Sequence, residues 1–173
     1  VREAVADSLN KRFDTHFEGK NIVMTVGAAG GLNVILKALI NPGDEVIAFA
    51  PYFGEYRSYT NNYDGVLVEI SPNTVDFQPK LDEFEQKITP KTKAMIINYP
   101  SNPTGGVMTK EDYAKIIDII KESGIYVISD EISRGDDDSI FNNVTKTSYF
   151  CIFTYDGGSF PAKFGKFFVQ KFS

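Results

Sequence analysis

The feature that most constrains the fold is an alternation of two patterns along residues 22 to 132. Short runs of β-branched and other apolar residues, such as 45–50, 66–70 and 125–129, are separated by segments in which apolar residues recur every three or four positions. The short runs are typical of strands buried on both faces, and the longer segments predict amphipathic helices. Together they predict an α/β domain with a doubly wound, mainly parallel sheet, whose ligand site is expected at the carboxyl ends of strands.

The bounds of the expected elements follow from residues that interrupt this alternation. Asn41-Pro42-Gly43-Asp44 ends one helix, and Thr109 precedes an acidic turn and therefore predicts a helix N-cap. We expect helices over 1–13, about 32–39, about 79–88 and from 109 to 124, and strands at 22–26, 45–50, 66–70, 94–98 and 125–129.

The sequence changes character after Arg134. Residues 135–173 hold eight of the chain's 14 Phe residues but show no clear period of 3.6 or 2. We therefore divide the chain into a domain of residues 1–134 and an aromatic-rich tail of unassigned structure. The tail could form a hairpin against the sheet, exchange into a partner or lack structure. Partial burial is favoured, because a long aromatic surface in water promotes aggregation.

Charge and composition argue against several classes of function. A net charge of -5 disfavours nucleic acid, which is bound by clustered Lys and Arg. No apolar run approaches the roughly 18 residues that cross a bilayer, and we expect neither a membrane span nor a secretory signal. One His and one Cys provide little material for a zinc site or a Ser-His-Asp triad. The single Cys151 cannot form an internal disulfide, which favours the cytoplasm.

Three segments at predicted strand ends carry residues that could bind a ligand. Gly27-Ala28-Ala29-Gly30-Gly31 joins a strand to a helix, where free N–H groups and the helix dipole favour a phosphate, although a tight turn explains the glycines about as well. The amide of Asn102, in a loop with two prolines and two glycines, could donate to a ligand or bond its own backbone. Asp130 ends the last clear strand, where a semi-buried carboxylate needs a cation or several hydrogen bonds, or caps the next segment.

These segments occur together, in order, at the ends of strands. The runs TVGAAGGL at 25–32, NPGDEVIAFAPYFGEY at 41–56, NPTGG at 102–106 and VISDEI at 127–132 resemble the aspartate-aminotransferase family, fold type I of the pyridoxal-phosphate (PLP) dependent enzymes. The resemblance covers about residues 1 to 132 and implies most of the cofactor-binding large domain. It also implies a PLP cofactor, amino-group transfer between an amino acid and a 2-oxo acid, and a homodimer.

The resemblance implies a role for single residues as well. Residues 27–29 match the turn whose backbone holds the cofactor phosphate. Phe53 matches the aromatic residue that stacks on the pyridine ring, with Tyr52 as the neighbouring alternative. Asn102 matches the asparagine that hydrogen-bonds the phenolic oxygen, and Asp130 matches the aspartate that pairs with the pyridine nitrogen and keeps the ring protonated as an electron sink.

Two positions depart from the family pattern. Ser133 stands where the family has a tyrosine that also contacts the phenolic oxygen, and its hydroxyl is too short to reach equally far. The catalytic lysine, in a Ser-x-Ser-Lys context, and the phosphate-binding Arg behind it are not recognisable. Lys163 is the nearest match and Lys166 the next, although each is more typical of a solvated surface lysine.

The family's amino-terminal segment, the rest of its large domain and its small domain are also absent from the sequence. We therefore expect a truncated aminotransferase-like domain with weak or absent transamination. One alternative is a non-catalytic module that binds PLP weakly or not at all. Another is a nucleotide-binding α/β domain, which the lack of a dinucleotide or Walker motif disfavours.

Overall fold

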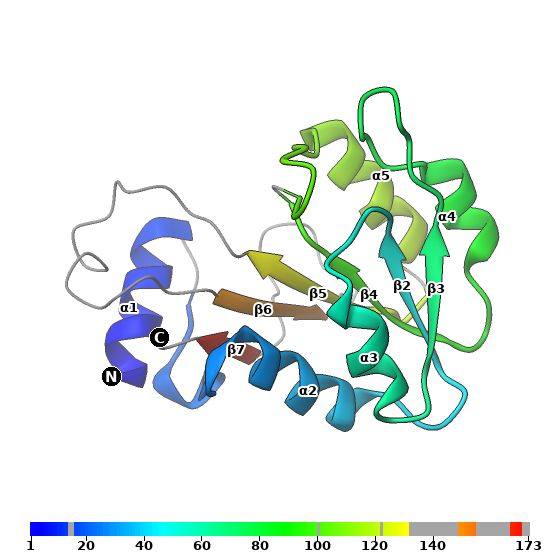
Figure 1. Ribbon diagram of the computed structural model, residues 1–173. Helices are drawn as coiled ribbons and strands as arrows, with labels where there is room; N and C mark the ends of the chain where they lie inside the picture. The colour runs from blue at the N-terminus through cyan, green and yellow to red at the C-terminus, as the bar shows by residue number, and fades with distance from the viewer. Residues whose placement is uncertain (14–15, 100, 122, 132–148, 155–166, 171–173) are drawn as a thin grey trace.

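A seven-stranded sheet carries helices on both faces (Figure 1). The computed structural model describes residues 1–13, 16–99, 101–121, 123–131, 149–154 and 167–170. The helices are α1 (Arg2–Phe13), the 3-10 turn η1 (Gly19–Asn21), α2 (Gly27–Leu39), α3 (Glu55–Asn61), α4 (Leu81–Lys87) and α5 (Lys110–Ile120). The strands are β1 (Ile22–Met24), β2 (Glu45–Phe49), β3 (Val66–Ile70), β4 (Thr92–Ile97), β5 (Tyr126–Glu131), β6 (Tyr149–Thr154) and β7 (Phe167–Gln170).

The sheet is mainly parallel, with the strand order β1-β7-β6-β5-β4-β2-β3. Neighbouring strands are parallel except at β6, which is antiparallel to both β5 and β7. The predicted fold class is therefore confirmed. Because β1, β2, β4 and β5 run in the same direction, their carboxyl ends lie at one edge of the sheet. We call this the carboxyl edge.

Alternate residues of the central strands face opposite sides of the sheet and build two separate cores. The α2/α3 core comprises Leu32, Ile35, Leu36, Ile40, Val46, Ala48, Tyr56, Leu67, Ala94, Ile96 and Ile128. The α4/α5 core comprises Ile47, Phe49, Ile70, Phe84, Met95, Ile97, Met108, Ile116, Ile120 and Ile125. Adjacent strand residues thus belong to different cores, which is the period of two expected of a strand covered on both faces.

Helix ends follow the local signals in the sequence. The predicted N-cap is confirmed, because the Thr109 side chain accepts from the Asp112 N–H while Asp112 Oδ2 accepts from the Thr109 N–H, both at 3.1 Å. Gly124, which follows α5, has φ of 71°, a conformation that favours glycine. The predicted first helix is also present and packs Val5 on β1, but Val1 is 83% exposed and lies outside its buried face.

The tail contributes β6 and β7, which lie between β5 and β1 and pair antiparallel with each other. Of the three arrangements that the sequence left open for the tail, a hairpin against the sheet is the one that these two strands resemble. The division at Arg134 stays a prediction, since Arg134 lies outside the described residues. Among the residues described, no helix is both long enough and apolar enough to cross a membrane.

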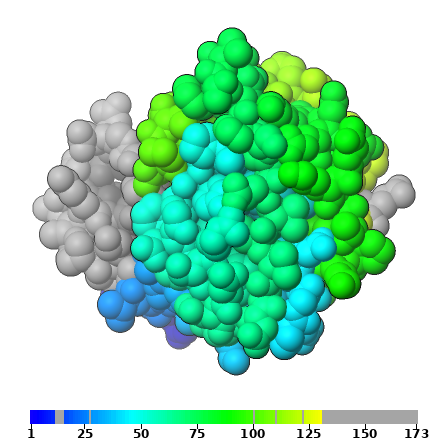
Figure 2. Space-filling model, turned by 45° about the vertical axis from the view of Figure 1, so that its right-hand side comes forward, coloured from blue at the N-terminus to red at the C-terminus, as the bar shows by residue number. Residues whose placement is uncertain are grey.

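The middle of the chain forms one continuous face of the molecule. Figure 2 shows this face in cyan to green, the colours of the segment that includes β2, α3, β3 and α4.

Candidate functional site

The candidate residues meet at the carboxyl edge because each follows or ends a strand of the same direction. Gly27 to Ala29 follow β1, Tyr52 and Phe53 follow β2, Asn102 follows β4, and Asp130 lies one residue before the end of β5. This edge is where a parallel sheet with helices on both faces binds ligands.

The carboxylate of Asp130 is the most deeply buried charged group described at this edge. The residue is only 2% exposed, and its Oδ2 accepts a hydrogen bond of 2.5 Å from the phenol of Tyr56, a fully buried residue of α3. Burial and the charge of Asp130 raise the pKa of Tyr56 far above its usual value, so the phenol remains protonated and donates. This donor holds the Asp130 side chain in place.

Two aromatic rings enclose Tyr56. The ring of Tyr52 stacks on it with a centroid distance of 6.1 Å and an interplanar angle of 14°, and the ring of Phe53 meets it edge-on at 5.9 Å. Such contacts add to the burial of the phenol and restrict its ring. Tyr56 therefore presents its hydroxyl to Asp130 from a fixed position.

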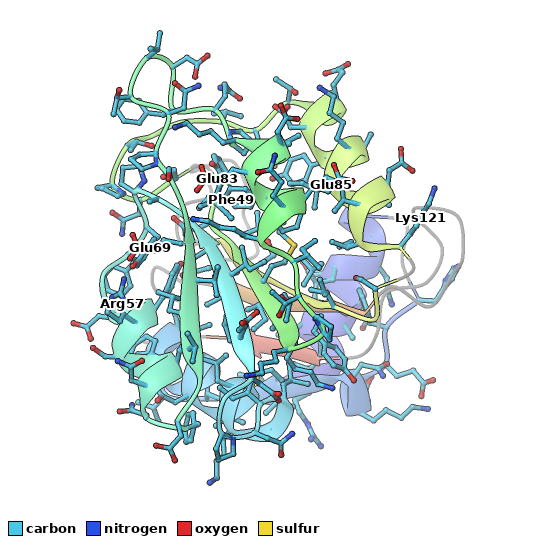
Figure 3. All side chains as sticks on the ribbon, turned by 90° about the vertical axis from the view of Figure 1, so that its right-hand side faces the viewer. Phe49, Arg57, Glu69, Glu83, Glu85 and Lys121 are labelled. Carbon is cyan, nitrogen blue, oxygen red and sulfur yellow. The ribbon has the colours of Figure 1, made fainter. Side chains whose placement is uncertain are left out.

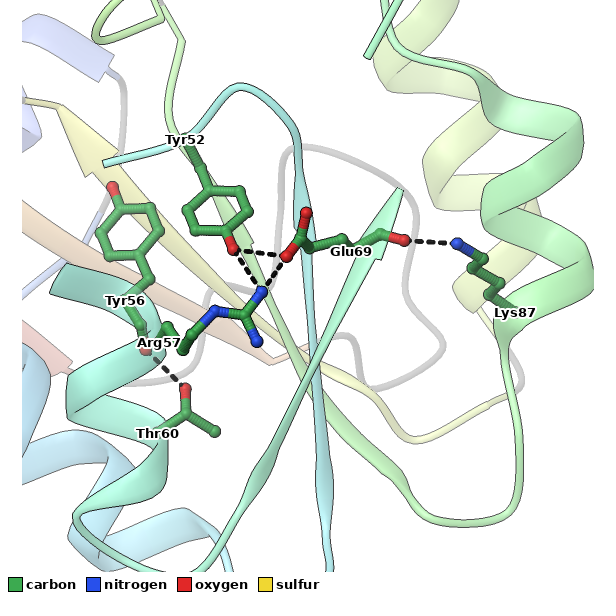
Figure 4. Close-up of polar contacts among 6 residues, drawn as sticks. All are labelled: Tyr52, Tyr56, Arg57, Thr60, Glu69 and Lys87. Atoms are coloured by element: carbon green, nitrogen blue, oxygen red, sulfur yellow. Dashed lines mark hydrogen bonds and ion pairs between the residues drawn. The ribbon is translucent and has the colours of Figure 1, made fainter. Parts of the chain in front are cut away.

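The hydroxyl of Tyr52 is directed toward the edge strand β3. It donates to Glu69 Oε2 at 2.8 Å and accepts from Arg57 Nη2 at 3.0 Å, while Arg57 and Glu69 form an ion pair (Figures 3 and 4). The ring of Phe53 has no polar atom, and the residue is 37% exposed. Of the two aromatic candidates, Phe53 is therefore the one whose ring remains open to a ligand.

The glycine-rich turn forms the first turn of α2. The helix begins at Gly27, after Val26, whose side chain is 93% exposed. Ala28 packs against the α2/α3 core, and Ala29 is exposed. The first N–H groups of an α-helix have no partner within the helix, and the small side chains here leave them accessible to an anion.

Asn98 connects two of the candidate residues. Its Nδ2 donates to the backbone carbonyl of Asp130 at 2.8 Å, and its Oδ1 accepts from the backbone N–H of Asn102 at 2.7 Å. The Asn102 loop is also closed by the N–H of Ser101, which donates to the Gly106 carbonyl at 2.8 Å. The side chain of Asn102 is exposed, so its amide is placed at the surface of the edge rather than bonded in the core.

The sequence analysis assigned no role to Asn98 or Tyr56. For Asn98, however, the strand period indicates a buried polar position. Ala94 and Ile96 face the α2/α3 core, and the period of two places Asn98 on the same side. Ile128 and Asp130 continue the same face of the neighbouring strand. A polar residue that continues a buried face is expected to have hydrogen-bond partners, and for Asn98 these partners are the two candidate segments.

Three residues that the sequence analysis considered for the site lie outside the described residues: Ser133, Lys163 and Lys166. Within the described part of the chain, His, Cys, Asp and Glu side chains form no group of three or more that could hold a metal ion.

Comparisons with known proteins place the chain in one family. Residues 1–133 match the family model described as aminotransferase class I and II. An aspartate/prephenate aminotransferase of Thermus thermophilus is 34% identical over 133 residues, which cover 76% of this chain and 34% of that protein. The chain spans about a third of the length of the curated relatives it matches.

Solved structures show the same similarity. An aminotransferase from Eubacterium rectale superposes with a TM-score of 0.72 at 40% identity, covering 76% of this chain and 35% of that one. An aspartate aminotransferase from Thermotoga maritima gives a TM-score of 0.72 at 35% identity, covering 75% of this chain and 35% of that one.

Proposed function

We propose, since the chain belongs to the aminotransferase class I and II family, that its carboxyl edge binds PLP for amino-group transfer between an amino acid and a 2-oxo acid. The observation that carries this proposal is the buried Asp130 carboxylate, held by Tyr56 at the end of β5. A protonated pyridine nitrogen is a cation that would pair with such a carboxylate. Bound PLP supplies an electron sink for the charge left when a substrate loses its α-proton.

The donor set of the edge fits the parts of this cofactor. Asp130 would hold the proton on the ring nitrogen, because a buried anion favours the protonated form of a neighbouring base. The first N–H groups of α2 would bind the phosphate, and Phe53 would pack on the ring. The exposed amide of Asn102 would donate to the phenolic oxygen. Tyr52 is a weaker candidate for ring stacking, because its hydroxyl is held by Glu69 and Arg57.

The covalent anchor of the cofactor is proposed to be Lys163, with Lys166 as the alternative. The sequence has no Ser-x-Ser-Lys motif, and we therefore propose weak or absent turnover for this 173-residue chain. Borohydride treatment with PLP followed by intact-mass measurement tests the anchor. An adduct that Lys163→Ala abolishes supports Lys163, and an adduct that only Lys166→Ala abolishes supports the alternative.

Titration with PLP, followed by tyrosine fluorescence because the chain has no Trp, tests the cofactor itself. We expect saturable binding that Asp130→Asn weakens by roughly thirtyfold or more, because loss of a buried charge partner costs about 2 kcal/mol or more. Inorganic phosphate and unphosphorylated pyridoxine serve as controls. A response to NAD or ATP without a response to PLP would instead support the nucleotide-binding alternative, and no response to any of them would support the non-catalytic module.

A homodimer is proposed from the resemblance alone, and a cytoplasmic location is proposed from the single cysteine of the chain. Light scattering at several concentrations checks the first, since a monomer at all concentrations contradicts it.

A further inference from the structure

We infer that Asn98 is a positioning residue that fixes Asn102 and Asp130 relative to each other. This inference rests on the proposed function, in which these two residues contact the phenolic oxygen and the nitrogen of one rigid ring. Asn98 itself faces the protein and touches no ligand in this arrangement.

The hydrogen-bond partners determine which side of the Asn98 amide is the oxygen and which is the nitrogen. A backbone N–H can only donate and a backbone carbonyl can only accept, so Oδ1 must face Asn102 and Nδ2 must face Asp130. Asn98 is 7% exposed, and a flipped amide would break both bonds, of which the one to Asp130 is buried. The side chain therefore has one orientation, and that orientation ties the loop to the strand.

The link is direct although the two segments are far apart in the sequence. Asp130 follows Asn102 only after the rest of the loop, α5 and most of β5. Continuing the register of β4 and β5 by one residue beyond Ile97 and Ser129 brings Asn98 opposite Asp130. The Asn98 side chain then spans from this strand end to the loop. A displacement of either segment changes the distance between the two cofactor contacts.

Tyr56 holds the other end of the same aspartate. Its phenol binds the Asp130 carboxylate, whereas Asn98 binds the Asp130 carbonyl. Asp130 is thus held at its side chain by Tyr56 of α3 and at its backbone carbonyl by Asn98, the residue after β4. Of these two residues, Asn98 is the one that also binds Asn102. The role of Asn98 therefore differs from that of Tyr56.

Two substitutions separate the two bonds. Asn98→Asp keeps an acceptor oxygen for the Asn102 N–H but loses the donor to the Asp130 carbonyl. Asn98→Ala loses both. Thr104→Ala is the matched control, because the Thr104 hydroxyl accepts from the Gly106 N–H at 3.2 Å inside the same loop without touching Asn98 or Asp130.

Amide hydrogen exchange of the full chain without added cofactor tests the link. In Asn98→Ala we expect exchange at Asn102 and over residues 129–131 to rise by roughly tenfold, as for the loss of a buried hydrogen bond. In Asn98→Asp only the second segment should change. Thr104→Ala should leave both segments within about twofold of the parent chain. Unchanged exchange at both segments in Asn98→Ala overturns the inference.

Measurement of PLP affinity distinguishes a positioning role of Asn98 from a general contribution to stability. We expect Asn98→Ala to weaken PLP binding by roughly tenfold at a temperature well below unfolding, and to leave the affinity for inorganic phosphate unchanged, since α2 does not depend on Asn98. Equal losses for both probes, or none for PLP, contradict a positioning role. If the parent chain itself does not bind PLP, the proposed function fails, while the exchange data still decide whether Asn98 links the two segments.

Discussion

The two cores of this domain share the same strands but differ in what lies at the ends of those strands. On the α4/α5 side the buried residues are all apolar, with Phe49 and Phe84 in ring contact at a centroid distance of 5.4 Å. On the α2/α3 side the interior ends in a polar group of three residues, Tyr56, Asn98 and Asp130. The core on one face of the sheet thus stabilises the fold alone. The core on the other face stabilises the fold and also carries the polar residues of the proposed site.

The period of two explains how one sequence supports both. After the last residue of β4, Asn98 continues the α2/α3 face, whereas Tyr99 packs against the α4/α5 core. The strand can therefore end in a polar residue on one side without placing an unsatisfied group in the other core. Because of this difference, we expect substitutions in the α4/α5 core to lower stability only, and substitutions in the α2/α3 core to lower stability and also to weaken ligand binding.

The largest expected effect is the loss of Phe84, which is fully buried in the α4/α5 core. Phe84→Ala should lower the free energy of unfolding by about 3 to 5 kcal/mol, because it removes a buried ring and leaves a cavity. PLP affinity of the folded protein should be unchanged. Urea denaturation and PLP titration measure the two quantities.

A partner variant on the other side sharpens this prediction. Leu36, also fully buried, lies on α2, and Leu36→Ala should cost about 2 to 5 kcal/mol and also weaken PLP binding, because it loosens the helix whose first turn is proposed to bind the phosphate. Equal changes in PLP affinity for both variants would contradict the division between the two sides. If either alanine variant fails to fold, Phe84→Leu and Leu36→Val provide smaller changes at the same positions.

Much of this division could be predicted from the sequence. Strand and helix periodicity predicted the alternation and the carboxyl edge, and the bounds of β3 were predicted to the residue. The Tyr56 contact could not be predicted, because it joins α3 to β5 across 74 positions and depends on the packing angle of a seven-residue helix. The strands β6 and β7 were not predicted either, since the tail has no clear period and pairing partners distant in sequence leave little local pattern.

The next effect in size concerns the phenol that holds Asp130. Tyr56→Phe keeps the ring but removes the donor, so a buried acceptor loses its hydrogen bond, and we expect a loss of about 1 to 3 kcal/mol in unfolding free energy and several-fold weaker PLP binding. Tyr59→Phe, the same chemical change on the same helix, is the control and should change stability by about 0.5 kcal/mol or less. Denaturant unfolding that gives equal losses for both variants would show that the Asp130 contact adds nothing beyond packing.

The dependence of stability on alkaline pH allows a comparison of the two cores, because there is a tyrosine with a raised pKa on each side. Burial raises the pKa of Tyr99 to about 12, and burial together with Asp130 raises that of Tyr56 further. Above pH 10 the unfolded chain loses these protons while the folded chain retains them, so stability present below pH 10 falls as pH rises. Each tyrosine contributes a slope of at most about 1.4 kcal/mol per pH unit.

The two variants should therefore alter different parts of this pH profile. In urea unfolding between pH 9 and 12.5, Tyr99→Phe should reduce the slope between pH 10 and about 12. Tyr56→Phe should also reduce the slope that persists at higher pH. Profiles parallel to that of the parent chain for both variants would mean that neither phenol is protected by folding.

The smallest expected effect lies outside both cores, on α4. Glu83 Oε1 accepts from Lys87 at 2.7 Å and from the backbone N–H and the hydroxyl of Ser71 at 3.0 and 2.8 Å, and these donors lower the pKa of Glu83 to about 2. Its contribution to stability is present above pH 4.5 and is lost as pH falls toward 2. Because solvent screens this surface pair, Glu83→Gln should cost less than about 1 kcal/mol at neutral pH.

Acid unfolding completes the comparison between the surface pair on α4 and the buried pair of Tyr56 and Asp130. The difference between Glu83→Gln and the parent chain should shrink as pH falls to 2, and also in about 1 M salt, where charges are screened within about 3 Å. Glu85→Gln, on the same helix (Figure 3), changes net charge equally and should show no such convergence. The two polar contacts have similar lengths, 2.7 Å and 2.5 Å, so a cost for Glu83→Gln as large as that for Tyr56→Phe would mean that burial does not set their strength.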